Sequence, residues 1–330
     1  MTSTIDHSAA SAPWGSRPTP SSGAATFERL VRGNTSEKVR VPTASRADAL
    51  SLSRPEGGRT EAGERTSLRG VSDVELRYEL AEGVARLTID RPARRNALSW
   101  TVLRELRARL AEIRDDPDAR VVGLTGAGHK AFCAGADLTG MAAGAGHLEL
   151  HESRGELAGL FGDLWSLGKP TIARVRGYAL AGGMGLALAC DLVVAADDAV
   201  FGTPEIDVGL WPYMITVPLV RSMPPKKALE LMMTGRRVGA AEAERIGFVN
   251  RVVPVDELDA AVDELARTLA AKSPAIMALG RQSFYDVWDQ AATDALPLLH
   301  ALLTVNAGTE DAAEGIAAFT EKRPPSWSGR

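Results

Sequence analysis

Cysteine is nearly absent from this sequence, because the 330 residues include only Cys133 and Cys190. Two cysteines cannot form the disulfide framework that stabilises small secreted domains, and so few of them fit a reducing compartment. Aromatic residues are also scarce, at 5% of the chain, although hydrophobic residues make up 45%. A chain of this length and composition buries a sizeable core without disulfides. We therefore expect a cytoplasmic globular protein.

Two further absences restrict the partners of the protein. No apolar stretch approaches the roughly 20 residues that a membrane-spanning helix needs, and residues 1–12 lack the charged and apolar regions of a secretory signal. The formal net charge is −4 at pH 7, whereas a general nucleic-acid binder needs clustered Lys and Arg. We expect neither a membrane nor a nucleic acid as a partner.

Residues 1–72 differ in composition from the rest of the chain. They contain few large apolar side chains and many Ser, Thr, Pro, Gly and Arg residues. Such a segment cannot bury enough surface to offset its chain entropy, so a disordered N-terminal extension is predicted. Residues 1–72 hold 10 basic against seven acidic side chains, which leaves 28 basic and 35 acidic side chains for residues 73–330. Any cationic binding site in residues 73–330 must therefore be local.

The order of the predicted elements indicates an α/β fold. Residues 74–80 alternate apolar and polar side chains, as a half-buried strand does, and a turn joins them to a second strand over 84–90. A helix is predicted from Ser99, and strands and helices then alternate. The remaining predictions are strands at 121–124, 171–175, 191–195 and 199–202, and helices at 150–167, 183–190, 225–234, 240–246, 256–271, 274–291 and 293–307. Such an order predicts an α/β core followed by helices.

Three loops rich in glycine and other small residues follow predicted strands. They span residues 131–138 after the strand at 121–124, residues 176–185 after 171–175, and residues 201–206 after 199–202. Backbone with few side chains lets a ligand approach N–H groups closely. The second loop also opens a helix, whose free N–H groups favour negative charge. Its glycine spacing is neither a dinucleotide fingerprint nor a phosphate loop.

Together these loops resemble those of the enoyl-CoA hydratase/isomerase family, the crotonase superfamily. The similarity runs from about Asp73 to Arg330, and it includes four more segments: 91–98 (RPARRNAL), 234–237 (TGRR), 247–254 (GFVNRVVP) and 314–323 (EGIAAFTEKR). The resemblance implies an α/β fold, a crotonase-like spiral of ββα units over 73–255, with a C-terminal helical region at 256–330. That region would mediate trimerisation and cap the CoA. A homotrimer or homohexamer is implied, with an acyl-CoA substrate and no separate cofactor.

The resemblance also assigns site residues. The backbone N–H groups of Ala136 and Gly182 would form an oxyanion hole, which stabilises the charge that develops on a thioester oxygen when a neighbouring proton is removed. The implied CoA-binding residues are Ala93, Arg94, Ala134, Leu138, Phe319 and Lys322. No metal ion is expected.

The catalytic carboxylates set this chain apart from the hydratases of the family. Hydratases resemble one another in two glutamates that hold a water molecule; this sequence has Glu205 at one of these positions and Gly185 at the other. A single glutamate is the pattern of Δ3,Δ2-enoyl-CoA isomerases, in which one base moves a proton from C2 to C4. We therefore predict Glu205 as the catalytic residue of an isomerase or a hydratase-type enzyme. The residues predicted to shape the acyl pocket are Trp211, Tyr213 and Met214.

Several alternatives stay open at this point. Other one-glutamate members of the superfamily imply a C–C lyase, a decarboxylase or a hydrolase acting on an unusual acyl-CoA. A non-catalytic member that binds RNA or protein is a second alternative. Asp207 either faces the site or is solvated, and His147 with His151 and Glu152 forms a surface segment rather than a metal site. Both cysteines are expected to be buried.

Overall fold

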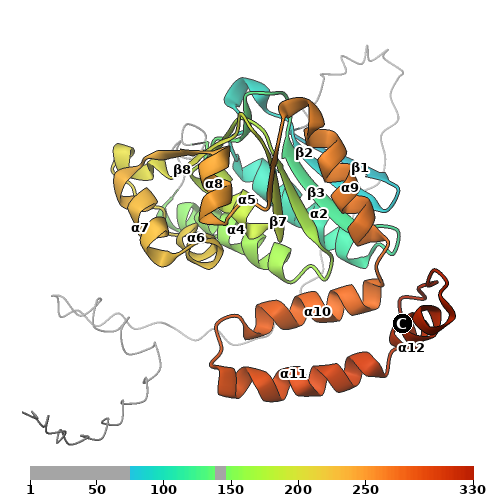
Figure 1. The fold of residues 1–330 in the computed structure, drawn as a ribbon. Coiled ribbons are helices and arrows are strands. Elements are labelled where there is room, and N and C mark those ends of the chain that lie inside the picture. Colours follow the sequence, from blue (N-terminus) through green and yellow to red (C-terminus); the bar gives the residue numbers. More distant parts are fainter. Residues whose placement is uncertain (1–74, 138–145) are drawn as a thin grey trace, which may run out of the picture. The chain divides into compact units, whose positions relative to one another are not determined.

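The computed structural model describes residues 75–137 and 146–330 (Figure 1). The predicted extension at 1–72, the start of the core at 73–74 and Leu138 lie outside the described residues. The elements are β1 (Leu76–Ala81), β2 (Val84–Ile89), η1 (Pro92–Arg94), α2 (Trp100–Asp115), β3 (Val121–Gly126), β4 (Ala131–Cys133), α4 (His147–Trp165), β5 (Thr171–Val175), β6 (Tyr178–Leu180), α5 (Gly182–Ala189), β7 (Leu192–Ala196), β8 (Val200–Gly202), η2 (Pro204–Val208), α6 (Thr216–Ser222), α7 (Pro225–Thr234), β9 (Arg237–Gly239), α8 (Ala240–Ile246), β10 (Arg251–Val253), η3 (Val255–Glu257), α9 (Leu258–Ala270), α10 (Pro274–Val287), α11 (Ala292–Ala307) and α12 (Glu310–Glu321).

The strands form two sheets. Five longer strands and the short strand β10 make a six-stranded sheet in the order β1-β2-β3-β5-β7-β10, and the other short strands make a four-stranded sheet in the order β4-β6-β8-β9. β1 and β2 form the predicted antiparallel hairpin, and β2, β3, β5, β7 and β10 run parallel. In the four-stranded sheet β4, β6 and β8 are parallel, and β9 is antiparallel to β8.

The chain repeats one unit between these sheets. A long strand (β3, β5 or β7) enters the large sheet, a short strand (β4, β6 or β8) enters the small sheet, and a helical segment follows. This repeat is the ββα spiral that the sequence implied, with the predicted helical region after it.

The prediction of where the loops begin was wrong in detail. The first two glycine-rich loops do not leave the ends of the long strands, because residues 131–133 and 178–180 form β4 and β6 in between. All three residues of β4 are buried, so they show no alternation of apolar and polar side chains. A three-residue strand of this kind resembles a loop in sequence. The sequence analysis also missed the three-residue strands β9 and β10 and the helices α6 and α12.

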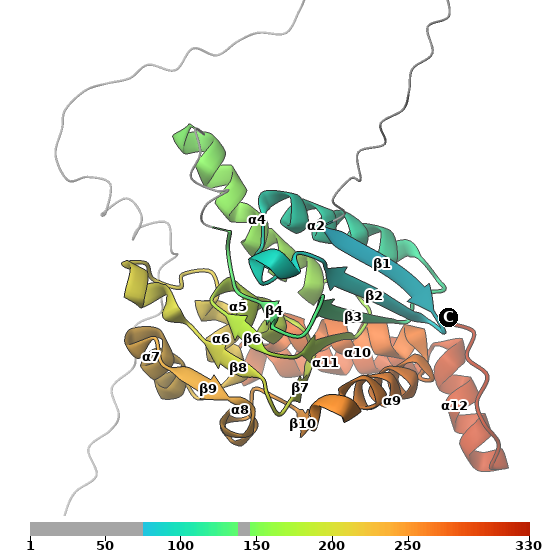
Figure 2. The ribbon, with the colours of Figure 1, turned by 90° about the horizontal axis from the view of Figure 1, so that it is seen from above.

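Both faces of the large sheet are covered, as Figures 1 and 2 show. One face packs against α2, α4 and α5 in a core that also includes residues of the short strands. The other face packs against α9. Neighbouring residues of one strand point to opposite faces, so that in β7 Val193 belongs to the first core and Val194 to the second. The sheet is therefore buried on both sides, as parallel sheets are.

Local signals explain the helix boundaries. α2 begins after Ser99, whose side chain accepts the Val102 N–H at 3.1 Å, and Asp116 ends it close to the predicted position. α10 begins after Ser273 with proline in its first turn, an arrangement that favours helix initiation. None of the helices in the described ranges combines the length and the hydropathy that crossing a bilayer requires.

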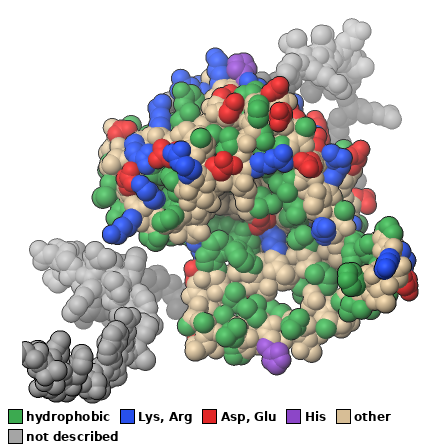
Figure 3. Space-filling view, in the orientation of Figure 1, with side chains coloured by type: hydrophobic (Ala, Val, Ile, Leu, Met, Phe, Trp, Pro, Cys, Tyr) green, Lys and Arg blue, Asp and Glu red, His purple; other side chains and the backbone are tan. Residues whose placement is uncertain are grey.

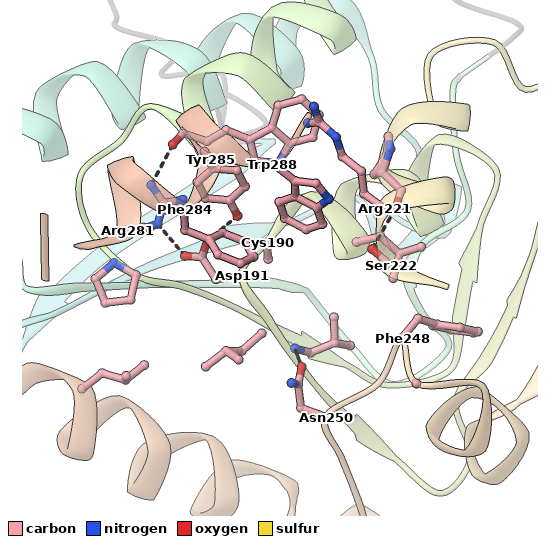
Figure 4. Close-up of a pocket in the computed structure, with 18 of the residues that line it drawn as sticks. Cys190, Asp191, Arg221, Ser222, Phe248, Asn250, Arg281, Phe284, Tyr285 and Trp288 are labelled. Atoms are coloured by element: carbon pink, nitrogen blue, oxygen red, sulfur yellow. Dashed lines mark hydrogen bonds and ion pairs between the residues drawn. The ribbon is translucent and has the colours of Figure 1, made fainter. Parts of the chain in front are cut away.

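A buried polar cluster joins α10 to the core (Figure 4). Arg281 of α10 pairs with Asp191 at 2.8 Å and also donates to the carbonyl groups of Leu164 and Trp165 at the end of α4. The Tyr285 hydroxyl donates to the other oxygen of Asp191 at 2.5 Å, and burial raises the pKa of this phenol. We name Arg281, Tyr285 and Asp191 the α10 clamp. It borders a cavity of about 430 Å³ between α10 and the core.

The clamp predicts a marked loss of stability on replacing Asp191 by Ala. Arg281 is 8% exposed and would lose its counter-charge, and breaking a buried ion pair on one side costs about 3–5 kcal/mol. The matched control is Asp259→Ala, which breaks the Arg174 pair at a carboxylate that is 77% exposed; surface pairs contribute about 0–1 kcal/mol. Urea unfolding of both variants gives the comparison, and equal losses would contradict the clamp.

Candidate active site

Three loops come together at one edge of the four-stranded sheet. β4, β6 and β8 are parallel neighbours, so their carboxyl ends lie at the same edge. Loop 1 (residues 134–137) follows β4, loop 2 (Ala181 and the start of α5) follows β6, and loop 3 (residues 203–209) follows β8. Ligands of α/β sheets bind at such carboxyl ends. The sheet therefore brings together Ala136, Gly182 and Glu205, which the sequence analysis singled out.

Loops 1 and 2 contact each other through positions where no side chain fits. Gly135 has a φ of +98°, and a Cβ atom there would lie 2.7 Å from the Cβ of Ala181. A Cβ on Gly183 would lie 2.1 Å from the carbonyl oxygen of Cys133. Both positions therefore require glycine because the neighbouring chain segment comes so close. Gly135 requires it also because of its positive φ. The two backbones pack directly against each other.

A backbone bridge fixes the direction of the Ala136 amide. The Leu98 N–H donates to the Gly135 carbonyl at 2.8 Å, and the Asp137 N–H donates to the Leu98 carbonyl at 2.9 Å. In a planar trans peptide the C=O and the N–H point in opposite directions. Because Leu98 holds the carbonyl of the Gly135–Ala136 peptide, the Ala136 N–H points away from Leu98. It is thereby available to a ligand.

The Gly182 amide opens helix α5. The first N–H groups of an α-helix have no acceptor within the helix, and the helix dipole adds positive potential there. Ala181, just before it, has φ 52° and ψ −130°, a rare backbone conformation for a residue with a side chain. The Ala181 N–H donates to the Gly202 carbonyl of β8 at 2.8 Å, which ties loop 2 to loop 3.

Glu205 lies in the first turn of η2, after Pro204. Its side chain is half-buried, and among the described residues its Oε2 atom is a buried oxygen without a hydrogen-bond partner. Desolvation by this burial raises the pKa of the Glu205 carboxyl above its ordinary value. A carboxyl group with a raised pKa is suited to exchange protons near neutral pH. The geometry therefore agrees with an acid or base at this position.

Apolar side chains fill the space beside Gly185. A Cβ atom on Gly185 would lie 2.2 Å from Cγ2 of Ile215 and 3.2 Å from Cζ of Phe161. Ile215 is 2% exposed and Phe161 is 3% exposed, and both belong to the main core. The position that lacks a second glutamate is thus occupied by hydrocarbon from two other elements. The sequence did not reveal this packing, since neither residue lies next to Gly185 in the chain.

The remaining residues near loop 3 lie in different surroundings. Trp211 packs partly buried against the main core, whereas Tyr213 is 73% exposed and Met214 is 38% exposed. The carboxylate of Asp207 lies beside Gly235 at the end of α7, about 3.0 Å from where a Cβ on that glycine would be. The structure thus places Asp207 toward the cap of α7.

The CoA residues implied by the resemblance fall into two groups. Ala93 and Arg94 belong to η1 and are exposed, and Ala93 borders a cavity of about 270 Å³ together with Pro92, Arg95, Asn96, Ala127, Gly128, His129, Lys130 and Ala131. The side chains of Arg95, His129 and Lys130 were missed in the sequence analysis, although Arg95 lies inside the RPARRNAL segment and Lys130 directly precedes β4. Ala134 is half-buried in loop 1.

The other two CoA residues lie on the C-terminal helices. Phe319 is in α12 and is 86% exposed, and Lys322 caps the end of that helix. α12 packs on α10 and α11, and both ribbon views show it apart from β4, β6 and β8 (Figures 1 and 2). Within one chain, Phe319 and Lys322 are not brought to the three loops.

Among the described residues, the His, Cys, Asp and Glu side chains form no metal site, and both cysteines are buried. In residues 75–137 and 146–330, no three His, Cys, Asp or Glu side chains form a group that could hold a metal ion. His147 and His151 are exposed on α4. Cys133 and Cys190 are both buried, and burial raises the pKa of the Cys133 thiol to about 12. A thiol with such a pKa is a poor nucleophile at neutral pH.

Known proteins are similar to this chain in sequence and in structure. A family model described as enoyl-CoA hydratase/isomerase matches residues 79–330. A Mycobacterium bovis protein named "Probable enoyl-CoA hydratase" is 38% identical over 254 residues, 76% of this chain and 97% of the relative. Carnitinyl-CoA dehydratase of Escherichia coli K12 is 39% identical over 258 residues, 75% of this chain and 95% of the relative. The crystal structure of an enoyl-CoA hydratase from Mycobacterium smegmatis superposes with a TM-score of 0.75 at 35% identity, over 77% of this chain and 99% of that one.

The packing around Gly185 predicts that even a methyl group there is destabilising. Gly185→Ala places a Cβ atom 2.2 Å from Ile215, and overpacking of a core costs about 1–3 kcal/mol. The matched control is Gly162→Ala in helix α4, where no atom lies within 4 Å of the new Cβ; alanine in place of a helical glycine stabilises by about 0.5–1 kcal/mol. Thermal unfolding of both variants should move in opposite directions, and a stabilised Gly185→Ala would contradict the packing.

Proposed function

The chain belongs to the enoyl-CoA hydratase/isomerase family, and from this premise we propose that it is a Δ3,Δ2-enoyl-CoA isomerase. Glu205 is the single acid and base of the proposed reaction. The amides of Ala136 and Gly182 are its oxyanion hole. The relatives are named hydratase and dehydratase, so the choice of reaction rests on the residues of this chain.

The proposed reaction moves one proton and keeps all atoms of the substrate. The Glu205 carboxylate removes a proton from C2 of a 3-enoyl thioester, and the electrons spread over a dienolate whose charge lies largely on the thioester oxygen. The two amides donate to this oxygen, and one such donor contributes about 3–4 kcal/mol to the transition state. The protonated Glu205 then returns the proton at C4. The 2-enoyl thioester results, and Glu205 is a carboxylate again.

The contact between Gly185 and Ile215 is the observation that carries this choice. Hydration needs a water molecule held for attack on C3, and the hydratase pattern uses a second glutamate for it. Here a Cβ atom alone would lie 2.2 Å from Ile215, so the side chain of a second glutamate does not fit at position 185 as packed. A lone carboxylate beside hydrocarbon favours proton transfer over addition of water.

CoA binding and assembly complete the proposal. Arg95, His129 and Lys130 around the cavity at Ala93 would attract the phosphates of CoA. Ala134 of loop 1 would also contact the CoA, and the CoA-binding role of Leu138 stays a prediction. Residues 73–255 would form the catalytic unit, and residues 256–330 the helices of assembly and CoA capping.

A homotrimer or homohexamer is proposed because large apolar side chains are exposed on the C-terminal helices. Figure 3 shows hydrophobic side chains over α10 and α11. The most exposed are Leu296 at 65%, Leu303 at 66%, Ile316 at 70% and Phe319 at 86%. Exposed apolar patches of this kind mark interaction sites. In such an assembly Phe319 and Lys322 of one subunit would reach the CoA of another.

The reaction is tested by incubating the protein with 3-enoyl-CoA and 2-enoyl-CoA thioesters and following the products by mass and retention time. We expect the double bond to shift without a change in mass. Glu205→Gln should bind the thioester normally and lower kcat by at least about 100-fold, since it removes the only base. A product heavier by one water would contradict the isomerase, and unchanged turnover of the variant would contradict Glu205. Release of CO2 or free CoA from malonyl-type or cyclic thioesters would favour a lyase, decarboxylase or hydrolase instead.

The buried Glu205 also predicts a pH profile. Because burial raises the pKa of Glu205, kcat/KM should rise with pH through a value above the ordinary glutamate pKa of about 4.3. The stability changes in the opposite sense. The folded state favours the protonated form, so the free energy of unfolding falls as pH rises from the ordinary pKa through the raised one. Glu205→Gln should abolish that fall, which urea unfolding across pH 4–8 measures. An acidic limb at an ordinary carboxyl pKa would contradict the assignment.

A further inference from the structure

Arg91 joins the two backbone segments that form the bridge beside the oxyanion loop. Its guanidinium group donates through one nitrogen to the Asp137 carboxylate at 2.8 Å and through another to the Ala97 carbonyl. Ala97 lies in the segment that pairs with loop 1, and Asp137 lies in loop 1 itself. The side chain of Arg91 is 13% exposed and that of Asp137 is 11% exposed. One partly buried cation thus holds both sides of the bridge.

The third nitrogen of Arg91 reaches a different part of the fold. Its Nε pairs with Glu75 at 2.7 Å, and the second oxygen of that carboxylate accepts the Ser99 hydroxyl at 2.6 Å. Ser99 caps helix α2. The guanidinium group is therefore engaged on every nitrogen and anchored to the start of β1 and of α2. A fully engaged, nearly buried cation serves to hold neighbouring groups in place rather than to bind a phosphate.

The position of Asp137 gives this anchor a chemical consequence. Asp137 directly follows Ala136. The N–H group of Asp137 donates the second hydrogen bond of the bridge to the Leu98 carbonyl. Movement of Asp137 relative to Leu98 would rotate the preceding peptides, including the one that carries the Ala136 N–H. Loop 2 is fixed differently, by its close backbone contact with loop 1 and by the hydrogen bond from Ala181 to Gly202. A charged anchor on loop 1 therefore acts on one donor of the pair.

We propose that Arg91 is a positioning residue, which holds Asp137 and thereby fixes the Ala136 N–H in the direction of the thioester oxygen. The inference rests on the proposed oxyanion hole and adds a residue to it. Arg91 does not touch the substrate, and its effect passes through Asp137 and the backbone. A shift of about 1 Å in a catalytic group can cost about 100-fold in rate. Loss of the anchor should therefore lower kcat and leave the binding of the thioester nearly unchanged.

The test uses two variants. Asp137→Asn keeps the shape of the side chain and removes its negative charge, and Arg91→Lys keeps the positive charge and removes the several N–H donors of the guanidinium group. The control is Asp163→Asn, which breaks an Arg107 ion pair of 2.6 Å between α2 and α4. Each variant is assayed for kcat and KM with 3-enoyl-CoA. Each is also titrated with acetoacetyl-CoA, whose enolate has its own ultraviolet absorption and reports the oxyanion hole directly. Circular dichroism checks that each variant is folded.

We expect kcat to fall about 10- to 100-fold in Asp137→Asn and in Arg91→Lys, with a weaker enolate signal at saturating acetoacetyl-CoA and little change in KM. Asp163→Asn should lose some stability and keep both kcat and the enolate signal. A folded Asp137→Asn variant with the kcat and the enolate signal of the wild type would overturn the inference. If Asp137→Asn does not fold, the same two measurements on Arg91→Lys decide. A wild-type protein that binds acetoacetyl-CoA without forming the enolate would instead overturn the proposed oxyanion hole, and the inference with it.

Discussion

The site depends on the direct contact between the backbones of loop 1 and loop 2. Gly135 and Gly183 allow this contact because a Cβ atom at either position would overlap the neighbouring segment of the chain. Backbone packed at this distance has little freedom to reorient, so the amides that follow it are held before any ligand arrives. Preorganised donors of this kind stabilise a developing charge without the cost of reorientation during the reaction. The other residues of the proposed site are arranged around that contact.

The short sheet explains why the contact forms between segments distant in sequence. β4, β6 and β8 run parallel side by side, and each ends at the same edge with a loop. The third loop brings Glu205, whose burial raises the pKa of its carboxyl. Gly185, in contrast to Glu205, has apolar neighbours, because Ile215 and Phe161 pack against it. One edge of a small sheet therefore carries the two amides and the carboxyl group of the proposed site, and hydrocarbon packs at Gly185.

Much of this arrangement could be predicted from the sequence. The hairpin, the long strands β3, β5 and β7 and the helices α2 and α9 to α11 follow from periodicity and capping, and the matched segments indicated the fold and the candidate residues. Of the short strands only β8 was predicted; β4 and β6 were taken for loops, because three largely buried residues show no alternation of apolar and polar side chains. Ile215 beside Gly185 and Arg91 beside Asp137 also escaped the sequence, since these contacts join residues 30 and 46 positions apart. Contacts of this kind depend on how the units of the spiral pack together.

The α10 clamp has a consequence for how such a protein can diverge. It attaches the C-terminal helices through Asp191, Arg281 and Tyr285, none of which belongs to the three loops. Substitutions in loop 3 can therefore change the chemistry while the attachment of the helices is inherited intact. The converse also holds, because changes on the outer faces of α11 and α12 leave the backbone donors untouched. Catalysis and attachment are separable traits in this fold, and selection can act on each without first undoing the other.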